Sequence, residues 1–253
     1  MGKKRRIKVW EGSKDTVTSK VARKAILIKF GKREHLEQLV NGDFRFSPLS
    51  KFKSYEKKGG INDPNEGTTI QEHTDLTMIP QTGKRIEIKN ATFSTSTNWI
   101  QERGIFCLSA PDLIAERVEK EGTVFRIDMD YIERMQSEFK GCDTIAVFDR
   151  KAVEEGLDSY SNRVNIQVWH DEISYLSQKE RNEKAYEISK SVVIPGFVKD
   201  IEMSYQNEYR IMLDSKLEEP TFIKIDELSK KCELFPIKNL GDFALFVDVQ
   251  RDF

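Results

Sequence analysis

The stretch Ala25-Ile26-Leu27-Ile28-Lys29-Phe30 predicts a short buried strand that ends at Gly31, because apolar residues dominate consecutive positions. The segment that follows, His35–Val40, has the apolar spacing of a helix, and Asn41-Gly42 is typical of a helix C-terminus. Residues 44–49 predict a second strand that runs into a turn. The chain therefore opens with a strand, a short helix and another strand, which favours a mixed fold.

The rest of the sequence predicts many short strands and a few helices, with no repeat at a fixed period. Residues 57–83 carry Gly, Asn and Pro in clusters, so we expect a long loop there. Further strands are predicted at residues 85–96, 105–109, 123–127, 144–148, 164–168, 208–213, 222–225 and 244–247, and further helices at 111–120, from 131 onward and at 175–189. We expect one α+β domain over residues 21–253, preceded by a basic flexible arm over residues 1–20.

Composition limits the class of protein. The 253 residues include 15 Phe, 7 Tyr and 3 Trp, which are enough large side chains for a folded core. No apolar run reaches the ~18 residues that a membrane span needs, so we expect no membrane partner. The 3 isolated cysteines argue against a disulfide scaffold and favour a reducing cytoplasm, and the 3 histidines lack zinc-ligand spacing. The glycine motifs of P-loop NTPases and Rossmann dehydrogenases do not occur.

Charge is distributed unevenly along the chain, although the net charge is only −1. Residues 1–60 hold 17 Lys and Arg against 6 Asp and Glu, and the run Lys3-Lys4-Arg5-Arg6 lies near the start. Such a basic region suits contact with a phosphate backbone, so we expect RNA or DNA as a partner. The alternative is a solvated tail, with the two halves of the chain neutralising each other in the fold.

The stretch Ser204–Ile211 holds the strongest candidate for chemistry. If it is extended, its period of two places Gln206 and Glu208 on one face. Two such polar side chains at the end of a strand can hold a ribose, and the carboxylate can stabilise positive charge when a nicotinamide–ribose bond breaks. The alternative is a solvent-facing edge strand in which Glu208 pairs with Arg210 or a lysine.

Short motifs spread over about residues 26–213 carry a resemblance to a known family. They are Arg45-Phe46-Ser47, Asn62-Asp63-Pro64-Asn65-Glu66, Cys107-Leu108-Ser109 and Gln206-Asn207-Glu208-Tyr209-Arg210. Their order resembles an uncharacterised bacterial family that is frequent near phage-defence genes, and it is similar to that of ADP-ribosyltransferase toxins, including the DNA-targeting DarT type. The resemblance implies a split antiparallel β-sandwich with flanking helices around an NAD cleft. It also implies a toxin or phage-defence effector with a neutralising antitoxin as a partner.

The same resemblance implies roles for individual residues in moving ADP-ribose from NAD⁺ to a macromolecule, with nucleic acid favoured over protein. Glu208 matches the catalytic glutamate, and Gln206 matches the first position of the Q/E-x-E motif. The implied cofactor-binding residues are Lys29, Phe30, Arg45, Ser47, Ser94, Thr95 and Ser109, and the implied substrate-binding residues are Asn62, Asp63, Glu66 and Asn207. No metal ion is implied.

Two features depart from the pattern of the ADP-ribosyltransferases. Their first strand ends with an Arg or His that binds NAD, whereas the first predicted strand of this chain ends with Lys29-Phe30. Arg45 on the next strand is the candidate to bind NAD in its place. Either Ser94 or Ser109 supplies the serine that braces Glu208, and the sequence leaves this choice open.

Two other functions remain as alternatives. Asp63, Glu87 and Lys89 have the D…ExK arrangement of Mg²⁺-dependent nucleases, in which carboxylates hold the metal ion and the lysine steadies the attacking water. The absence of an Arg or His at the end of the first strand favours a non-catalytic binding or antitoxin-like module that kept the fold and lost the chemistry.

Overall fold

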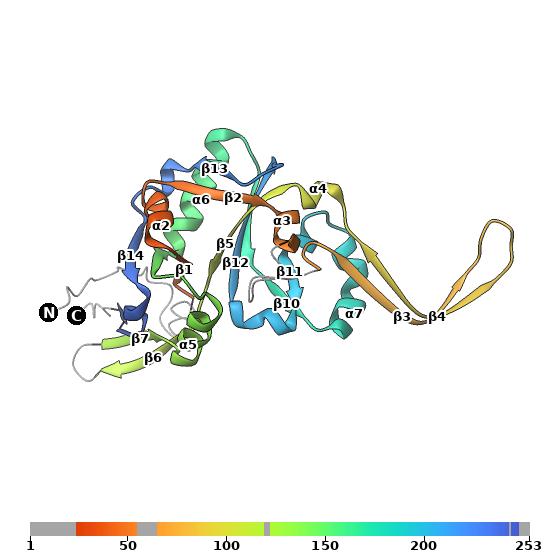
Figure 1. The fold of residues 1–253 in the computed structure, drawn as a ribbon, viewed down its shortest axis with the longest axis horizontal. Helices are drawn as coiled ribbons and strands as arrows, with labels where there is room; N and C mark the ends of the chain where they lie inside the picture. Colours follow the sequence, from red (N-terminus) through yellow and green to blue (C-terminus); the bar gives the residue numbers. More distant parts are fainter. Residues whose placement is uncertain (1–23, 55–64, 119–121, 243, 248–253) are drawn as a thin grey trace, which may run out of the picture.

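The computed structural model describes residues 24–54, 65–118, 122–242 and 244–247, and the expected arm over residues 1–20 lies outside them. Helices pack on mainly antiparallel strands, so the fold is α+β, as the sequence predicts (Figure 1). No helix among the described residues has the length and apolar character that crossing a membrane requires.

A large sheet forms the centre of the described structure (Figure 1). Its strands run in the order β13-β2-β5-β1-β8-β14, and β12 and β9 extend it from β5. Their bounds are β1 Ile26–Gly31, β2 Asp43–Pro48, β5 Arg103–Ser109, β8 Thr144–Asp149, β9 Val168–Glu172, β12 Glu208–Lys216, β13 Thr221–Lys224 and β14 Cys232–Pro236. The helices are α2 Arg33–Val40, α3 Leu49–Ser54, α4 Asn98–Gln101, α5 Met129–Glu138, α6 Arg150–Val164 and α7 Gln178–Ser189, with 3-10 turns η1 Ile194–Phe197, η2 Ile201–Gln206, η3 Asp226–Leu228 and η4 Ile237–Asp242.

Three smaller sheets accompany the central one. The first pairs β10 (Ser174–Leu176) with β11 (Val198–Asp200) in parallel, and the second holds β6 (Leu113–Val118), β7 (Gly122–Ile127) and β15 (Ala244–Val247). The third is a hairpin of β3 (Thr69–Met78) and β4 (Ile86–Thr95), which projects from the body of the molecule (Figure 1).

The central sheet divides at β5. Along one edge β5 pairs with β12 over its length, from Arg103↔Lys216 to Ser109↔Glu208. Along the other edge β5 pairs with β2 at Ile105↔Ser47 and with β1 at Ser109↔Ile28. Because β2 and β1 share one edge of the same strand, they diverge from each other, and the sheet opens beside the C-terminal end of β5.

Both faces of β1 are buried, which explains its continuous apolar sequence. Leu27 points into a cluster with Phe44, Phe106 and Phe148. Ile28 points to the opposite face, in a second cluster that includes Met135 of α5. A strand covered on both faces needs apolar residues at successive positions rather than at alternate ones.

The structure confirms most predicted strands and corrects several elements. The helix predicted at 111–120 is wrong, because β6 occupies Leu113–Val118 and pairs with β7. The loop predicted at 57–83 is wrong over Thr69–Met78, which forms β3 and pairs with β4 in a hairpin whose residues are mostly exposed. Helix α6 has no counterpart among the predicted elements. It continues to Val164, so the strand predicted at 164–168 begins only at Val168, as β9.

Gly42 shows how closely the segments after α2 and β13 approach each other. Its φ is +87°, and a Cβ there would lie 2.8 Å from the carbonyl oxygen of Ile225, whose N–H donates to the Gly42 carbonyl. We expect Gly42→Ala to lower the free energy of unfolding by about 2 kcal/mol or more, since it adds a steric clash to the cost of a positive φ. Urea denaturation followed by circular dichroism measures the change.

Gly141 provides the matched control, since its φ is +95° and no atom lies within 4 Å of the position that a Cβ would occupy. We expect Gly141→Ala to cost only about 1 kcal/mol, the cost of the backbone conformation alone. Equal losses for the two variants would contradict the close approach at Gly42.

Candidate functional site

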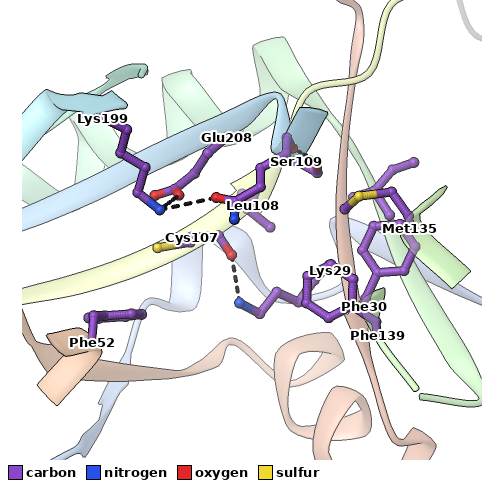
Figure 2. A pocket seen from close by; sticks show the side chains of 12 residues that line it. Lys29, Phe30, Phe52, Cys107, Leu108, Ser109, Met135, Phe139, Lys199 and Glu208 are labelled. Carbon is purple, nitrogen blue, oxygen red and sulfur yellow. Dashed lines mark hydrogen bonds and ion pairs between the residues drawn. The ribbon is translucent and has the colours of Figure 1, made fainter. Parts of the chain in front are cut away.

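A cavity of about 120 Å³ lies where the central sheet divides, between β1, β5 and β12 (Figure 2). Its polar lining consists of Lys29, Cys107, Ser109, Lys199, Gln206 and Glu208. Its apolar lining consists of Ile28, Phe30, Phe52, Leu108, Met135 and Phe139. The rings of Phe30 and Phe139 stack with centroids 5.1 Å apart, so one wall of the cavity is aromatic.

Backbone register brings the polar groups together. Ser109 ends β5 and lies opposite Ile28 of β1 on one edge and Glu208 of β12 on the other. Lys29, next to Ile28, directs its ammonium towards β5 and donates to the Cys107 carbonyl at 2.6 Å (Figure 2). The cavity therefore lies where three strands meet, although its residues are up to 180 positions apart in the sequence.

The segment before Glu208 is not extended, so the predicted alternation of Gln206 and Glu208 along a strand is wrong. Gln206 ends the turn η2, and Asn207 adopts a left-handed conformation with φ 44° before β12 begins at Glu208. Both side chains nevertheless meet Lys199, whose Nζ lies 3.1 Å from Gln206 Oε1 and 2.7 Å from Glu208 Oε2.

At one side of the cavity, Glu66, Lys199, Glu208 and Arg210 form a buried charge quartet, of which Lys199 and Glu208 line the cavity. Arg210 Nη2 lies 2.6 Å from Glu208 Oε1, and Arg210 Nη1 lies 2.6 Å from Glu66 Oε1. Lys199 Nζ lies 2.7 Å from Glu208 Oε2 and 3.4 Å from Glu66 Oε2. All four residues are buried, and their formal charges cancel.

The quartet determines the protonation of its members. Burial alone would raise the pKa of Glu208, but the positive charges of Arg210 and Lys199 outweigh it and hold that pKa well below its usual range. Burial lowers the pKa of Lys199, and the carboxylates of Glu208 and Glu66 outweigh this effect and raise it. The carboxylate and the ammonium at the cavity therefore stay ionised at neutral pH.

Other buried groups at the cavity stay neutral. Burial raises the pKa of Cys107 to about 12, so this residue is a thiol and not a nucleophile. The Ser109 hydroxyl donates to the Gln206 carbonyl and lies 2.6 Å from the Tyr131 hydroxyl, whose pKa burial also raises. The Glu208 N–H donates to the Tyr175 hydroxyl at 2.8 Å. These contacts fix the backbone on both sides of Glu208.

The structure gathers five residues of the predicted site at the cavity and places others elsewhere. Lys29, Phe30, Ser109, Gln206 and Glu208 line it. Ser109, and not Ser94, lies beside Glu208, since Ser94 and Thr95 are exposed on β4 of the hairpin. Arg45 is exposed on β2 opposite Phe222, and Ser47 is half-buried opposite Ile105, so neither lines the cavity.

The residues predicted to bind substrate are also divided. Asn62 and Asp63 lie outside the described residues. Glu66 is fully buried in the charge quartet and does not face an acceptor. Asn207 is half-buried in the turn that leads into β12, where its carbonyl accepts from Ala110 N at 2.6 Å.

Of the three residues in the predicted nuclease arrangement, two lie among the described residues. Glu87 and Lys89 are exposed on β4, opposite Thr77 and Asp75, while Asp63 lies outside the described residues. Within the described ranges, no group of three or more His, Cys, Asp or Glu side chains is placed to hold a metal ion.

Two charged residues of the site have roles that the sequence did not indicate. Lys199 is absent from the predicted site, and Arg210 is predicted only as a surface partner of Glu208. The pairing of Glu208 with Arg210 and a lysine is present, but it is buried rather than solvent-facing. In the sequence, Lys199 is distinguished only by its position directly after the apolar residues Phe197 and Val198.

Comparison with known proteins adds no relative to this description. No protein-family model matches the chain, and neither the curated proteins nor the solved structures contain a match. Support for a function therefore comes from the geometry of the cavity and from the resemblance carried by the short motifs.

The charge quartet makes a testable contribution to stability. Glu66→Gln keeps the shape of the side chain but leaves two buried cations against one carboxylate. We expect the free energy of unfolding to fall by about 3 kcal/mol, because breaking a buried ion pair leaves an uncompensated charge. Chemical denaturation measures the loss.

The matched control is Glu219→Gln, which removes a surface ion pair with Lys51 at 2.9 Å, in which the glutamate side chain is 72% exposed. Solvent screens such a pair, so we expect a change below about 1 kcal/mol. A loss for Glu66→Gln no larger than that of the control would refute the structural role of the quartet.

Proposed function

We propose that this chain binds NAD⁺ at the cavity between β1, β5 and β12 and transfers ADP-ribose to a macromolecule. The observation that carries the proposal is the meeting of Glu208, Gln206, Ser109 and Lys29 at one cavity with an aromatic wall. The motif resemblance implies a role in NAD⁺ chemistry for each of these four residues. Their convergence supports that interpretation over a chance match of short motifs.

The chemistry requires a negative charge beside the reacting ribose carbon. In the proposed reaction the bond from ribose C1′ to nicotinamide breaks, and nicotinamide leaves with the bonding electron pair as a neutral molecule. Positive charge develops at C1′, and an oxygen or nitrogen of the acceptor then attacks this carbon and releases a proton. The ionised Glu208 carboxylate would stabilise this charge and accept a hydrogen bond from the ribose 2′-hydroxyl.

Glu208 retains acceptor capacity despite its ion pairs. Arg210 donates to Oε1 through Nε and lies close to it through Nη2, whereas Lys199 donates to Oε2. A carboxylate has about four lone-pair sites, so Oε2 can accept from a ribose hydroxyl in addition to Lys199. Glu208 and Lys199 line the cavity, while Arg210 is not part of the lining.

The dimensions of the cavity indicate which part of NAD⁺ it would hold. A volume of about 120 Å³ is small beside the roughly 300–1,000 Å³ of pockets that enclose drug-sized ligands. We place the nicotinamide ring against Phe30 and Phe139, with its ribose towards Glu208. The diphosphate and adenosine would extend out of the cavity, and Lys29 has the charge to contact a phosphate.

A macromolecular acceptor, with nucleic acid favoured over protein, remains part of the proposal. Its support is the excess of 17 Lys and Arg over 6 Asp and Glu in residues 1–60. Activity of this kind in a cell would suit a toxin or phage-defence effector that a partner neutralises.

The reaction is tested by incubating the protein with NAD⁺ labelled in the adenylate phosphate, together with separate pools of RNA, DNA and cell protein. We expect label to enter one pool, nicotinamide to be released, and EDTA to have no effect. In Glu208→Gln we expect both readouts to fall by at least about 100-fold, since a charge aimed at the transition state is lost.

Two further variants separate chemistry from folding. Ser109→Ala should reduce transfer without removing a charge from the quartet, and the exposed Glu219→Gln should retain wild-type transfer. The proposal fails if wild type releases no nicotinamide, or if a folded Glu208→Gln protein transfers label as fast as wild type.

The pH dependence gives an independent check on Glu208. Since Arg210 and Lys199 hold its pKa below the usual 4.5, the carboxylate stays ionised as the pH falls from 8 to 5.5. We expect the rate of nicotinamide release to show no loss that titrates with this group across that window. A rate that falls with an apparent pKa near 6 would mean that the essential carboxyl is not held in the quartet.

A further inference from the structure

The β3–β4 hairpin is the most isolated feature of the described structure. Its strands stay in one register from Thr69↔Thr95 to Met78↔Ile86 and project from the body (Figure 1). Near the base it contacts α7, where the Glu72 N–H donates to Asn182 Oδ1 at 2.9 Å. The proposed NAD⁺ site does not use its distal half.

The distal half of the hairpin has one apolar and one polar face. Residues opposite each other on paired strands share a face, and successive residues alternate between faces. The pairs Leu76↔Ile88 and Met78↔Ile86 therefore form one face, which we call the apolar hairpin face. The pairs Asp75↔Lys89 and Thr77↔Glu87 form the opposite face.

The apolar hairpin face is open to solvent at its distal pair, and Leu76 and Ile88 are half-buried. Met78 is 45% exposed and Ile86 is 41% exposed. A two-stranded hairpin is only marginally stable by itself in water, and contiguous exposed apolar side chains usually mark a contact surface. A partner that covers this face would account for its composition.

We propose that the apolar hairpin face packs against the same face of a second copy of this chain. The two copies would be related by a two-fold axis that runs perpendicular to the strands and passes midway between the Leu76–Ile88 and Met78–Ile86 pairs. The Leu76–Ile88 pair of each copy would then contact the Met78–Ile86 pair of the other copy. Such a contact is isologous, because one surface patch serves both copies.

Charge complementarity selects this antiparallel arrangement. Beyond the apolar hairpin face lie Lys84, exposed in the turn at the tip, and Glu72, exposed towards the base. The axis places the tip of one hairpin over the middle of the other. Lys84 then lies at the level of Thr74 in the other copy, about 7 Å along the strands and one strand spacing of about 5 Å across from Glu72, a separation that the lysine and glutamate side chains span together. Two Lys84–Glu72 pairs would flank the apolar contact.

The size of the face sets the strength expected of this dimer. The overlap runs from the tip to the level of Thr74, about 7 residues or about 24 Å, and the ribbon is about 10 Å wide, so the contact is smaller than the roughly 1,600 Å² of a standard interface. We therefore expect a reversible dimer with a dissociation constant in the micromolar range, and not a permanent one.

Sedimentation equilibrium of the full chain, from about 1 to about 500 µM, tests the proposal. We expect wild type to pass from monomer to dimer over this range. Met78→Glu should raise the dissociation constant by at least about tenfold, since it puts a charge on the apolar hairpin face. Thr77→Glu, one residue away on the opposite face, is the matched control and should dimerise as wild type does.

A charge exchange tests the orientation of the two copies. Glu72→Lys and Lys84→Glu should each weaken the dimer, and the double variant should restore it, because the pairs re-form with reversed sign. A monomer at every concentration, a dimer indifferent to Met78→Glu, or single charge variants that the double variant does not rescue would overturn the proposal. Circular dichroism checks that each variant is folded. The result is independent of any activity with NAD⁺.

Discussion

The buried ion pairs among Glu66, Lys199, Glu208 and Arg210 are the constraint on which the site depends. The four residues come from the segment before β3, from β11 and from the start of β12. A charge removed from water is costly unless it is paired, so these segments must meet with matched geometry. The quartet therefore joins the base of the hairpin, the small parallel sheet and the central sheet around one point beside the cavity.

The division of the central sheet at β5 supplies the space that the quartet borders. Because β12 and β1 pair with opposite edges of β5, Ser109 has Glu208 on one side and Ile28 on the other. Backbone hydrogen bonds of the ladder thus set the positions of the polar groups, and the side-chain contacts refine them.

Sequence patterns predicted the parts of this arrangement that depend on local chemistry. The apolar run of β1, the Asn41-Gly42 end of α2 and the strand from Glu208 are confirmed, since each carries its own periodicity or cap. The helix predicted at 111–120 is wrong because pairing with β7 outweighs helical spacing. Lys199 was missed for a different reason, since its role comes from partners at positions 66 and 208 that no local pattern connects.

The two interpretations of Glu208 that the sequence left open are compatible in the structure. An unpaired carboxyl in so buried a place would have a raised pKa and would be neutral at physiological pH. A neutral acid cannot stabilise a developing cation, so the proposed chemistry requires the ion pairs that a purely structural interpretation also predicts. Arg210 lies behind the cavity and Lys199 lines it, so the pairing keeps Glu208 ionised while leaving it in the cavity lining. Structural pairing is therefore the condition under which a buried glutamate can act on a substrate at this position.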